Sequence, residues 1–358
     1  MDKHPQLRKL SAIGIIFLFS GISIIPSVAQ EAEKLLPASS DHWLYVGGSG
    51  PGNYTKIQDA INNASDGDTV FVYHGLYNEP LHEYSHVEID KKITLLGEDK
   101  NTTIINGSGV QRVVEIVIDD VNIRGFTIQN GGQPNTSYFG MGIEVDRSIK
   151  DVEISNNIIR NNMIGIEIGM GGYSSEIYIH DNDIRGNDLG IEIAANDSEI
   201  YHNTIISHNK QGILLASNKC SVYENIIADN SIGLDIAGES HIIYRNQIDT
   251  NEIGLRSINV RTTTIDSNNF MNNTKQVVLF KATSLLLAPS LPFLRQRWTE
   301  NYWDDWKKIT PRPLLGWGMV YIYLLIGGGY RLVPIGVFLS IEFDWHPAQQ
   351  PNNIPVVN

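Results

Sequence analysis

Acidic side chains recur at one position of a repeated pattern in the middle of the chain. Each repeat contains a glycine followed by alternating aliphatic and outward residues, and the residue two places after the glycine is acidic in four of five successive repeats. The acidic residues are Glu144, Glu167, Glu192 and Asp235, with Leu214 in the remaining repeat and Arg256 in the next one. If the repeats stack as strands about 4.8 Å apart, these carboxylates form a column on one outer face.

Such a column suits several kinds of chemistry. Glycoside hydrolysis needs two carboxyl groups roughly 5–10 Å apart, and neighbouring strands give this separation. Glu167 and Glu192 are therefore candidate catalytic residues. The four acids are also candidate ligands for sugar hydroxyls or for calcium, which prefers oxygen ligands. A solvated face with no ligand satisfies the same pattern, because adjacent like charges in water repel by only on the order of 1 kcal/mol.

A second outward row combines aromatic rings with charged groups. Tyr201, Tyr223 and Tyr244 recur at one position, and His180 occupies that position one repeat earlier. The position that follows holds, in successive repeats, Asn156, Asp181, His202, Glu224 and Arg245. Aromatic rings beside a few well-placed polar groups suit sugar binding, whereas alternating charges are also typical of a salt-bridged solvent face.

The best cluster of metal-ligating side chains precedes these repeats. His82, Glu83 and His86 follow Glu79, and a spacing of four would align two histidines on a helix, but Pro80 and the flanking strand patterns indicate a loop. Copper prefers His, Met and Cys ligands, and the sequence has no Met-x-x-Met or Cys-His pair. Calcium is therefore the better cofactor hypothesis and copper the weaker one. The sequence has no nucleotide-binding loop, zinc motif or Ser-His-Asp pattern.

Short strands must position all of these residues. The pattern Ile-x-x-Asn-x-Ile recurs with asparagines at positions 157, 182, 203, 225, 246 and 268, in steps of 21 to 25 residues. This period and the strict alternation of runs such as 189–193 predict a β-solenoid, which the crossover rule makes right-handed. We expect an all-β, right-handed parallel β-helix of roughly seven or more coils. The asparagines should form a structural ladder and tolerate left-handed backbone.

The two ends of the chain have different patterns. Residues 1–29 read as a secretory signal peptide, with an uncleaved anchor as the alternative. Residues 43–310 should form the β-helix domain, which begins with an amphipathic capping helix at 54–64 that uses Thr55 as its N-cap. Residues 311–358 should form a hydrophobic cap of two strands, since 314–330 is uncharged and mixes glycines with β-formers. A membrane anchor is the alternative.

Charge and cysteine content restrict the partners. The net charge of −13 argues against nucleic acid and anionic lipid. The single cysteine, Cys220, allows no intrachain disulfide, so stability must come from stacked strands. We expect a monomer that is secreted, extracellular or held at the cell surface (the periplasmic equivalent). It would contact a membrane only through an uncleaved signal or the C-terminal apolar segment.

Three motifs follow one another at the start of the β-helix: Ile57-Gln58-x-Ala60-Ile61 with Gly67-Asp68-Thr69-Val70, Gly75-x-Tyr77-x-Glu79, and Ile93-x-Leu95-x-Gly97-Glu98. They closely resemble the start of pectin-lyase-like right-handed β-helix proteins. The nearest subgroup is the NosD-like family, also described as carbohydrate-binding and sugar-hydrolase (CASH) domains. The segments 301–306 and 343–348 resemble the tail of archaeal surface members. The resemblance implies the β-helix fold, and its members include polysaccharide-active enzymes, periplasmic copper-related proteins and surface proteins.

These observations lead to three functional hypotheses. The first is a secreted or cell-surface protein that binds a polysaccharide or glycan through a side face, using Glu144, Glu167, Glu192, Asp235, Tyr201, Tyr223 and Tyr244. The second is a polysaccharide lyase or glycoside hydrolase that uses the outward carboxylates. The third, which the resemblance implies, is a NosD-like copper-handling accessory protein. Binding is favoured over catalysis, because any acidic column meets the geometric requirement of a hydrolase.

Overall fold

The computed structural model describes residues 42–79, 85–132, 140–169, 173–284, 296–326 and 329–355, with backbone alone at 283–284, 322–326 and 329–330. The expected signal peptide at 1–29 and the candidate metal ligands His82 and Glu83 lie outside these residues. Within them the chain forms a right-handed parallel β-helix with one short helix, α1 (Ile57–Asn63). The expected fold class is therefore confirmed.

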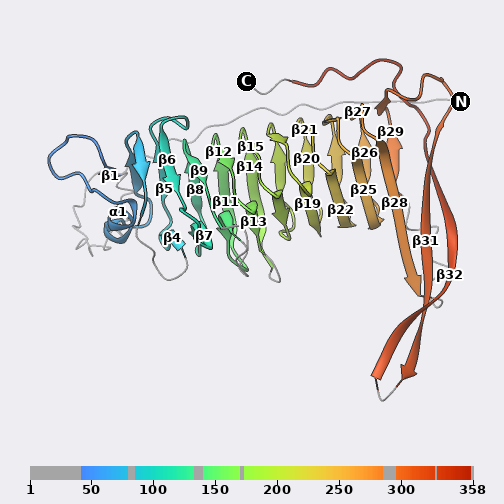
Figure 1. Cartoon of the computed structure of the whole chain (residues 1–358), viewed down its shortest axis with the longest axis horizontal. Helices are drawn as coiled ribbons and strands as arrows, with labels where there is room; N and C mark the ends of the chain where they lie inside the picture. Colours follow the sequence, from blue (N-terminus) through green and yellow to red (C-terminus); the bar gives the residue numbers. More distant parts are fainter. Residues whose placement is uncertain are drawn as a thin grey trace, which may run out of the picture. The chain divides into compact units, whose positions relative to one another are not determined.

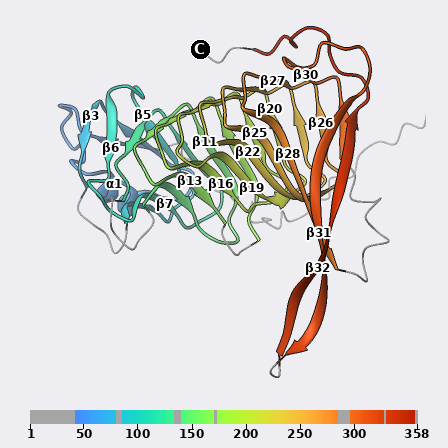
Figure 2. The same cartoon turned by 45° about the vertical axis from the view of Figure 1, so that its right-hand side comes forward.

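Each coil contributes one strand to each of three faces, and equivalent strands of successive coils pair in parallel. Figure 2 shows these strands stacked side by side between α1 and a C-terminal hairpin. Ten strands form face 2, so the described solenoid has ten coils, and the first three of these strands precede the regular asparagine repeat.

Face 1 consists of β1 (Trp43–Val46), β2 (Thr69–Val72), β5 (Thr94–Gly97), β8 (Val121–Arg124), β11 (Lys150–Ser155), β14 (Ser175–His180), β17 (Glu199–Tyr201), β20 (Ser221–Tyr223), β23 (Ile242–Tyr244), β26 (Thr264–Asp266) and β29 (Arg297–Thr299). Face 2 consists of β3 (Gly75–Tyr77), β6 (Thr103–Asn106), β9 (Thr127–Gln129), β12 (Ile158–Arg160), β15 (Asp183–Arg185), β18 (Thr204–Ile206), β21 (Ile226–Ala228), β24 (Gln247–Asp249), β27 (Asn269–Met271) and β30 (Tyr302–Trp303). Face 3 consists of β4 (Ser85–Ile89), β7 (Arg112–Ile116), β10 (Met141–Val145), β13 (Ile164–Ile168), β16 (Leu189–Ile193), β19 (Gln211–Asn218), β22 (Ile232–Glu239), β25 (Ile253–Arg261), β28 (Lys275–Ser284) and β31 (Arg312–Ile326). The last strand, β32 (Gly329–Asp344), runs antiparallel to β31.

The helix α1 packs Ile57, Ala60 and Ile61 into the core, as its amphipathic pattern predicts. Its N-cap differs from the expectation. The N-cap residue is Lys56, whose side chain makes no capping bond, and Thr55 lies outside the helix. The Glu79 carboxylate, which follows β3, instead accepts a 2.9 Å hydrogen bond from the Ile57 N–H. A distant side chain therefore satisfies a donor that the helix terminus leaves free.

A ladder of buried asparagines occupies the corner between face 1 and face 2. Asn203 N–H donates to Asn225 Oδ1 at 3.0 Å, and Asn225 Nδ2 donates to Ile200 O at 2.8 Å and to Asn246 Oδ1 at 3.0 Å. The left-handed backbone lies one residue earlier than expected, for example at Glu224, whose φ is 54°. The ladder comprises Asn157, Asn182, Asn203, Asn225, Asn246, Asn268 and Asn301. It satisfies backbone groups that the corner would otherwise leave unpaired.

Buried ladders also line the other two corners. His208 belongs to the ladder between face 2 and face 3, and Cys220 belongs to the ladder between face 3 and face 1. His208 takes the place of an asparagine between Asn187 and Asn230. Cys220, expected to be a plain turn residue, is fully buried, and its thiol donates to Ala195 O at 3.1 Å. Burial raises the pKa of this thiol, which keeps it protonated.

The buried histidine makes stability dependent on pH. The Asn187 N–H donates to His208 Nδ1 at 3.3 Å and His208 Nε2 contacts Ile184 O at 3.2 Å, an arrangement that suits the neutral ring. Burial lowers its pKa from 6.5 to about 4, so the unfolded chain binds the extra proton between these values. Stability is therefore complete above pH 6.5 and falls by about 3 kcal/mol as the pH drops to about 4. Urea unfolding at several pH values should show this loss in the native protein and a smaller loss in His208→Asn.

The β31–β32 hairpin closes the C-terminal end of the core. Asp344 Oδ2 accepts from the Asn301 backbone N–H at 3.2 Å and from Trp303 Nε1 at 3.0 Å, and so ends the asparagine ladder. Glu342 bonds Lys281 and Trp298, both at 2.7 Å. The expectation of two strands packed on the last coil agrees with this arrangement. No helix among the described residues is long and apolar enough to span a membrane.

Candidate functional site

The two rows of candidate residues lie on different faces. The acidic column runs along face 3, through Glu144 in β10, Glu167 in β13 and Glu192 in β16. The tyrosines run along face 1, through Tyr201 in β17 and Tyr223 in β20. The corner of each coil separates these faces, so the two rows form two candidate sites and not one. Both rows face outward, as the alternation predicts.

The acidic column is longer than the repeat indicates. Glu88 in β4 pairs in register with Glu115 in β7, and Glu115 pairs with Glu144. Five glutamates therefore occupy consecutive coils from Glu88 to Glu192. Leu214 follows them and interrupts the column before Asp235.

The members of the column have different environments. Arg112 bonds Glu144 and lies 3.6 Å from Glu115, so it compensates part of the charge. Glu167 and Glu192 are half-buried, and burial raises the pKa of both carboxyls, with repulsion from Glu192 adding to the shift at Glu167. Met141, Ile164 and Leu189, which are buried, form a small apolar cluster with the partly buried Leu214, and this cluster comes from the same strands of face 3. Burial also raises the pKa of Glu115 in the same column.

Asp235, which the sequence predicts as a ligand-binding residue, is buried and already paired with a cation. It is 2% exposed and accepts a 2.9 Å hydrogen bond from Arg256 Nε, and Arg256 occupies the same position in the next coil. This ion pair satisfies the carboxylate. The acidic column therefore ends at Glu192 as a surface for a ligand.

Face 1 carries a stack of four parallel rings. The ring centroids of His180 and Tyr201 are 4.6 Å apart, those of Tyr201 and Tyr223 are 4.9 Å apart, and those of Tyr223 and Tyr244 are 4.8 Å apart. Each inner ring has both faces covered by its neighbours, so the stack presents ring edges and hydroxyl groups to a ligand. Burial, together with a hydrogen bond to Glu199, raises the pKa of Tyr223.

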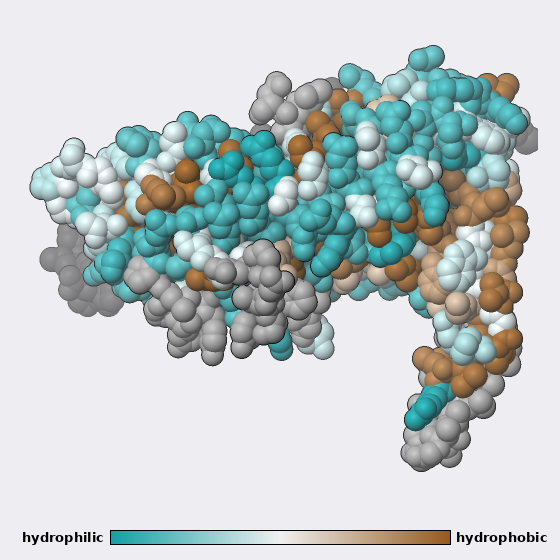
Figure 3. All heavy atoms as spheres, viewed as in Figure 1, coloured by the Kyte–Doolittle hydropathy of each residue, from teal (hydrophilic) through white to brown (hydrophobic). Residues whose placement is uncertain are grey.

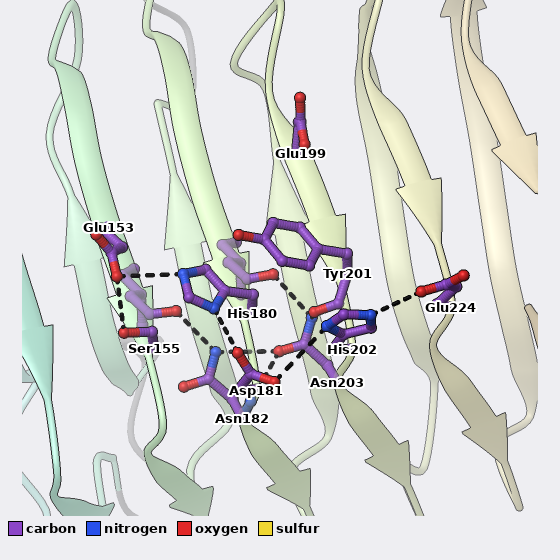
Figure 4. A network of polar contacts seen from close by, with 12 residues as sticks. Glu153, Ser155, His180, Asp181, Asn182, Glu199, Tyr201, His202, Asn203 and Glu224 are labelled. Carbon is purple, nitrogen blue, oxygen red and sulfur yellow. Dashed lines mark hydrogen bonds and ion pairs between the residues drawn. The ribbon is translucent and has the colours of Figure 1, made fainter. Parts of the chain in front are cut away.

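A polar network runs beside this stack and is formed by the residues that follow the stacked rings in the sequence, such as Asp181, His202 and Glu224 (Figure 4). His180 bonds Glu153 at 3.1 Å and Asp181 at 2.7 Å, while His202 bonds Glu224 at 2.7 Å. Arg245 continues the row with a 2.9 Å contact to Glu224. Acidic and basic side chains alternate along this row and bond one another, which agrees with the salt-bridged alternative.

A hollow of about 610 Å³ opens on face 1 on the N-terminal side of the ring stack. Its lining includes Lys92, Asp120, Asn122, Glu153 and Tyr178. Tyr178 is 37% exposed, and no other described ring stacks on it. Asn122 Oδ1 is buried and accepts no hydrogen bond from the described residues. The hollow therefore combines an open aromatic ring with an acceptor that lacks a donor.

A second aromatic cluster lies on face 1 beyond the other end of the hollow. Trp43 and Tyr45 in β1 contact Phe71 in β2 at ring distances of 6.1 and 6.0 Å, and Phe71 contacts Tyr73 at 5.1 Å. Trp43 is 42% exposed. The repeat pattern does not reveal this cluster, because the cluster lies before the regular repeats. Its signal in the sequence is the alternation Trp-x-Tyr in 43–45 and Phe-x-Tyr in 71–73.

The candidate metal site is only partly described. His86 is buried and its Nε2 lies 2.8 Å from Gly107 O, whereas His82 and Glu83 lie outside the described residues. Within the described ranges no group of three or more His, Cys, Asp or Glu side chains is arranged to hold a metal ion.

Residues 61–307 match the family model described as "Periplasmic copper-binding protein (NosD)". This match covers more than half of the chain, from α1 to the end of the regular coils. The chain belongs to the NosD family. No curated protein matches the sequence of this NosD-family chain.

Solved structures similar to this NosD-family chain are also β-helix proteins of low sequence identity. The mannuronan C-5 epimerase AlgE4 A-module of Azotobacter vinelandii is 15% identical, with a TM-score of 0.44 over 63% of this chain and 76% of that chain. Pectate lyase Pel9A is 12% identical, with a TM-score of 0.48 over 67% of this chain and 75% of that one. An alginate lyase from Paenibacillus sp. str. FPU-7 is 13% identical, with a TM-score of 0.41 over 63% and 90%.

Proposed function

We propose that this protein acts outside the cytoplasm and binds a carbohydrate chain along face 1. The observation that carries the proposal is the hollow beside Tyr178, in which an open aromatic ring lies among unpaired and paired hydrogen-bonding groups. A sugar presents apolar C–H groups on its ring faces and hydroxyls around its edge. Its recognition therefore needs an apolar surface and convergent polar groups in the same place.

The polar groups of the hollow match sugar hydroxyls. The Asp120 carboxylate is held by Lys92 at 2.6 Å, which leaves acceptor capacity toward the hollow. Glu153 accepts from Ser155 at 3.0 Å and also faces the hollow. A hydroxyl that donates to Asn122 Oδ1 would remove the cost of a buried unpaired acceptor.

The extent of face 1 indicates an oligosaccharide as ligand. Aromatic residues occur on both sides of the hollow, from Trp43 in β1 to Tyr244 in β23. These strands are separated by eight coil steps, which span roughly 40 Å at the usual strand spacing. The net charge of −13 disfavours a polyuronate and favours a neutral or amino-sugar chain.

A glycan-array screen of the purified protein tests this proposal, and Tyr178→Ala supplies the mutational test. Loss of the open ring should weaken binding of the selected glycan by roughly tenfold or more. Tyr173→Ala is the matched control, because Tyr173 is 88% exposed and does not line the hollow. Equal affinities for the two variants, or no binding of any neutral or amino-sugar glycan, would rule out the hollow as the binding site.

Cleavage of a polysaccharide is a second candidate function, favoured by the adjacent carboxyls of Glu167 and Glu192 with raised pKa values. Such a pair supplies one protonated acid and one base at mildly acidic pH. Release of new reducing ends from neutral polysaccharides by hydrolysis should then be measurable and should fall by at least a hundredfold in Glu167→Gln. The absence of such products at pH 4–7 would leave binding as the only activity.

Of the two candidate metal ions, calcium has more support from the described residues than copper. Calcium at the column is the first cofactor to test, because Glu167 and Glu192 are adjacent in register and Arg112, the cation that acts on Glu167, is bonded to Glu144. Copper handling is suggested by the description of the family. The described residues offer no metal-ligand cluster in its support.

A further inference from the structure

The C-terminal hairpin has its polar face inward and its apolar face outward. Along the base of the hairpin the buried residues include Glu342, Asp344 and Ser340, whereas the residues between them are exposed. Glu342 and Asp344 are held by Lys281, Trp298 and Asn301, as described above. The alternation of β32 then directs every second, apolar residue to the outside.

The exposed side chains form a continuous cross-strand ladder. The register pairs Leu315 with Ile341 and Trp317 with Leu339, while Phe343 and Val337 extend the ladder at its two ends. We name the six residues Leu315, Trp317, Val337, Leu339, Ile341 and Phe343 the outer hairpin face; their exposures range from 37% to 71%. Figure 3 shows this region as a hydrophobic surface beside a largely hydrophilic solenoid.

The apolar area of this face is as large as the largest apolar patches that isolated proteins normally expose to water. Six large apolar side chains at these exposures present roughly 600 Å² of apolar surface, at the upper end of the largest patch on a typical monomer. The patch continues onto β28, where Phe280 contacts the Trp317 ring at 4.7 Å. A partner that covers this face and its rim would bury close to the roughly 800 Å² per side of a stable interface.

Charge favours a second copy as that partner. The outer hairpin face carries no charged residue, although the chain as a whole carries −13. Two such faces can meet without placing like charges in contact. The outward side chains of a two-stranded ladder can interdigitate with those of another sheet about 10 Å away.

A lipid bilayer is a poorer partner for the same face. β32 pairs with β31 along its length, and among the described residues it pairs with another strand only where Asp344 meets Trp298. Its outer edge therefore presents unpaired backbone N–H and C=O groups. Each such group costs several kcal/mol in hydrocarbon, whereas water at the rim of a protein interface satisfies them.

We propose that the outer hairpin face binds the same face of a second copy of this chain and forms a two-fold symmetric dimer. The interface is isologous, so each side chain of the face meets the face of the partner copy. This inference departs from the monomer that we expect from the sequence. It is independent of the carbohydrate-binding proposal, because face 1 takes no part in the contact.

Sedimentation velocity on the purified full chain tests the proposal. From about 1 to 100 µM, the range of typical specific interfaces, the native protein should show a mass near twice that of one chain. Leu339→Glu should reduce the mass to one chain across this range, since the symmetry places two buried carboxylates near each other. Ile309→Glu is the matched control: Ile309 is 85% exposed and lies outside the face, so this variant should remain dimeric.

Two further measurements keep the outcomes distinct. Thermal melts should show that Leu339→Glu remains folded, and Val337→Lys provides a second monomeric variant if it does not. Native protein that stays monomeric throughout the range would overturn the proposal. Sedimentation with phosphatidylcholine vesicles that depends on Leu339, together with a monomeric mass in solution, would also overturn it and identify lipid as the partner.

Discussion

Replacing Asn225 with alanine is expected to cost roughly 3–6 kcal/mol of the free energy of unfolding, because several buried polar groups lose their partners at once. The Asn225 amide accepts from the Asn203 backbone N–H and donates to Ile200 O and to Asn246 Oδ1. All three partners are buried, and no water can replace the lost bonds in the close-packed corner.

Urea unfolding followed by circular dichroism measures this effect. Asn209→Ala is the control, since Asn209 is exposed and its amide bonds only Asp188 at the surface. The control should change the unfolding free energy by less than about 0.5 kcal/mol. Similar small losses in both variants would show that the ladder does not contribute to stability.

Ile191→Ala is expected to cost roughly 2–5 kcal/mol, through lost burial and a cavity that stacked coils cannot close. Ile191 is fully buried and is aligned with Ile166 and Ile213 in the neighbouring coils. Glu192→Ala, one residue along, should change stability little, because Glu192 faces outward and burial already disfavours its charged form. Equal losses for the two variants in urea melts would contradict the assignment of faces.

Much of the fold follows from the period of the sequence. Once coils of 21 to 25 residues stack in parallel, the alternation in runs such as 189–193 decides which side chains face the core. The ladder of asparagines and the column through Glu167 and Glu192 follow from the same register. The sequence does not reveal that His208 and Cys220 belong to similar ladders, since their types differ from the repeated residue.

The candidate sites were only partly predictable. Glu88 and Glu115 were missed because the steps to the next column residue are 27 and 29 residues there, outside the regular period. The repeat pattern does not reveal the hollow beside Tyr178, because its lining comes from five successive coils and includes turn residues such as Asp120. Spacing along a chain does not show the angle at a coil corner, so the separation of the acidic and tyrosine rows needed the structure.

The sequence also does not predict that the apolar face of the hairpin points outward. The alternation in 337–344 predicts a strand with one polar and one apolar face. It does not tell which face is inward. The ion pair of Glu342 with Lys281 and the bond from Trp298 decide this, and both partners come from earlier coils.

The central claim is that the ligand of this protein lies along face 1. The most direct test is calorimetric titration of the selected oligosaccharide into three proteins: native, Tyr178→Ala, and Glu167→Gln combined with Glu192→Gln. The account predicts that the Tyr178 variant loses roughly tenfold or more in affinity, while the double variant on face 3 binds like the native protein. Loss of binding in the double variant, with native affinity retained by Tyr178→Ala, would contradict the claim and place the ligand on the acidic column.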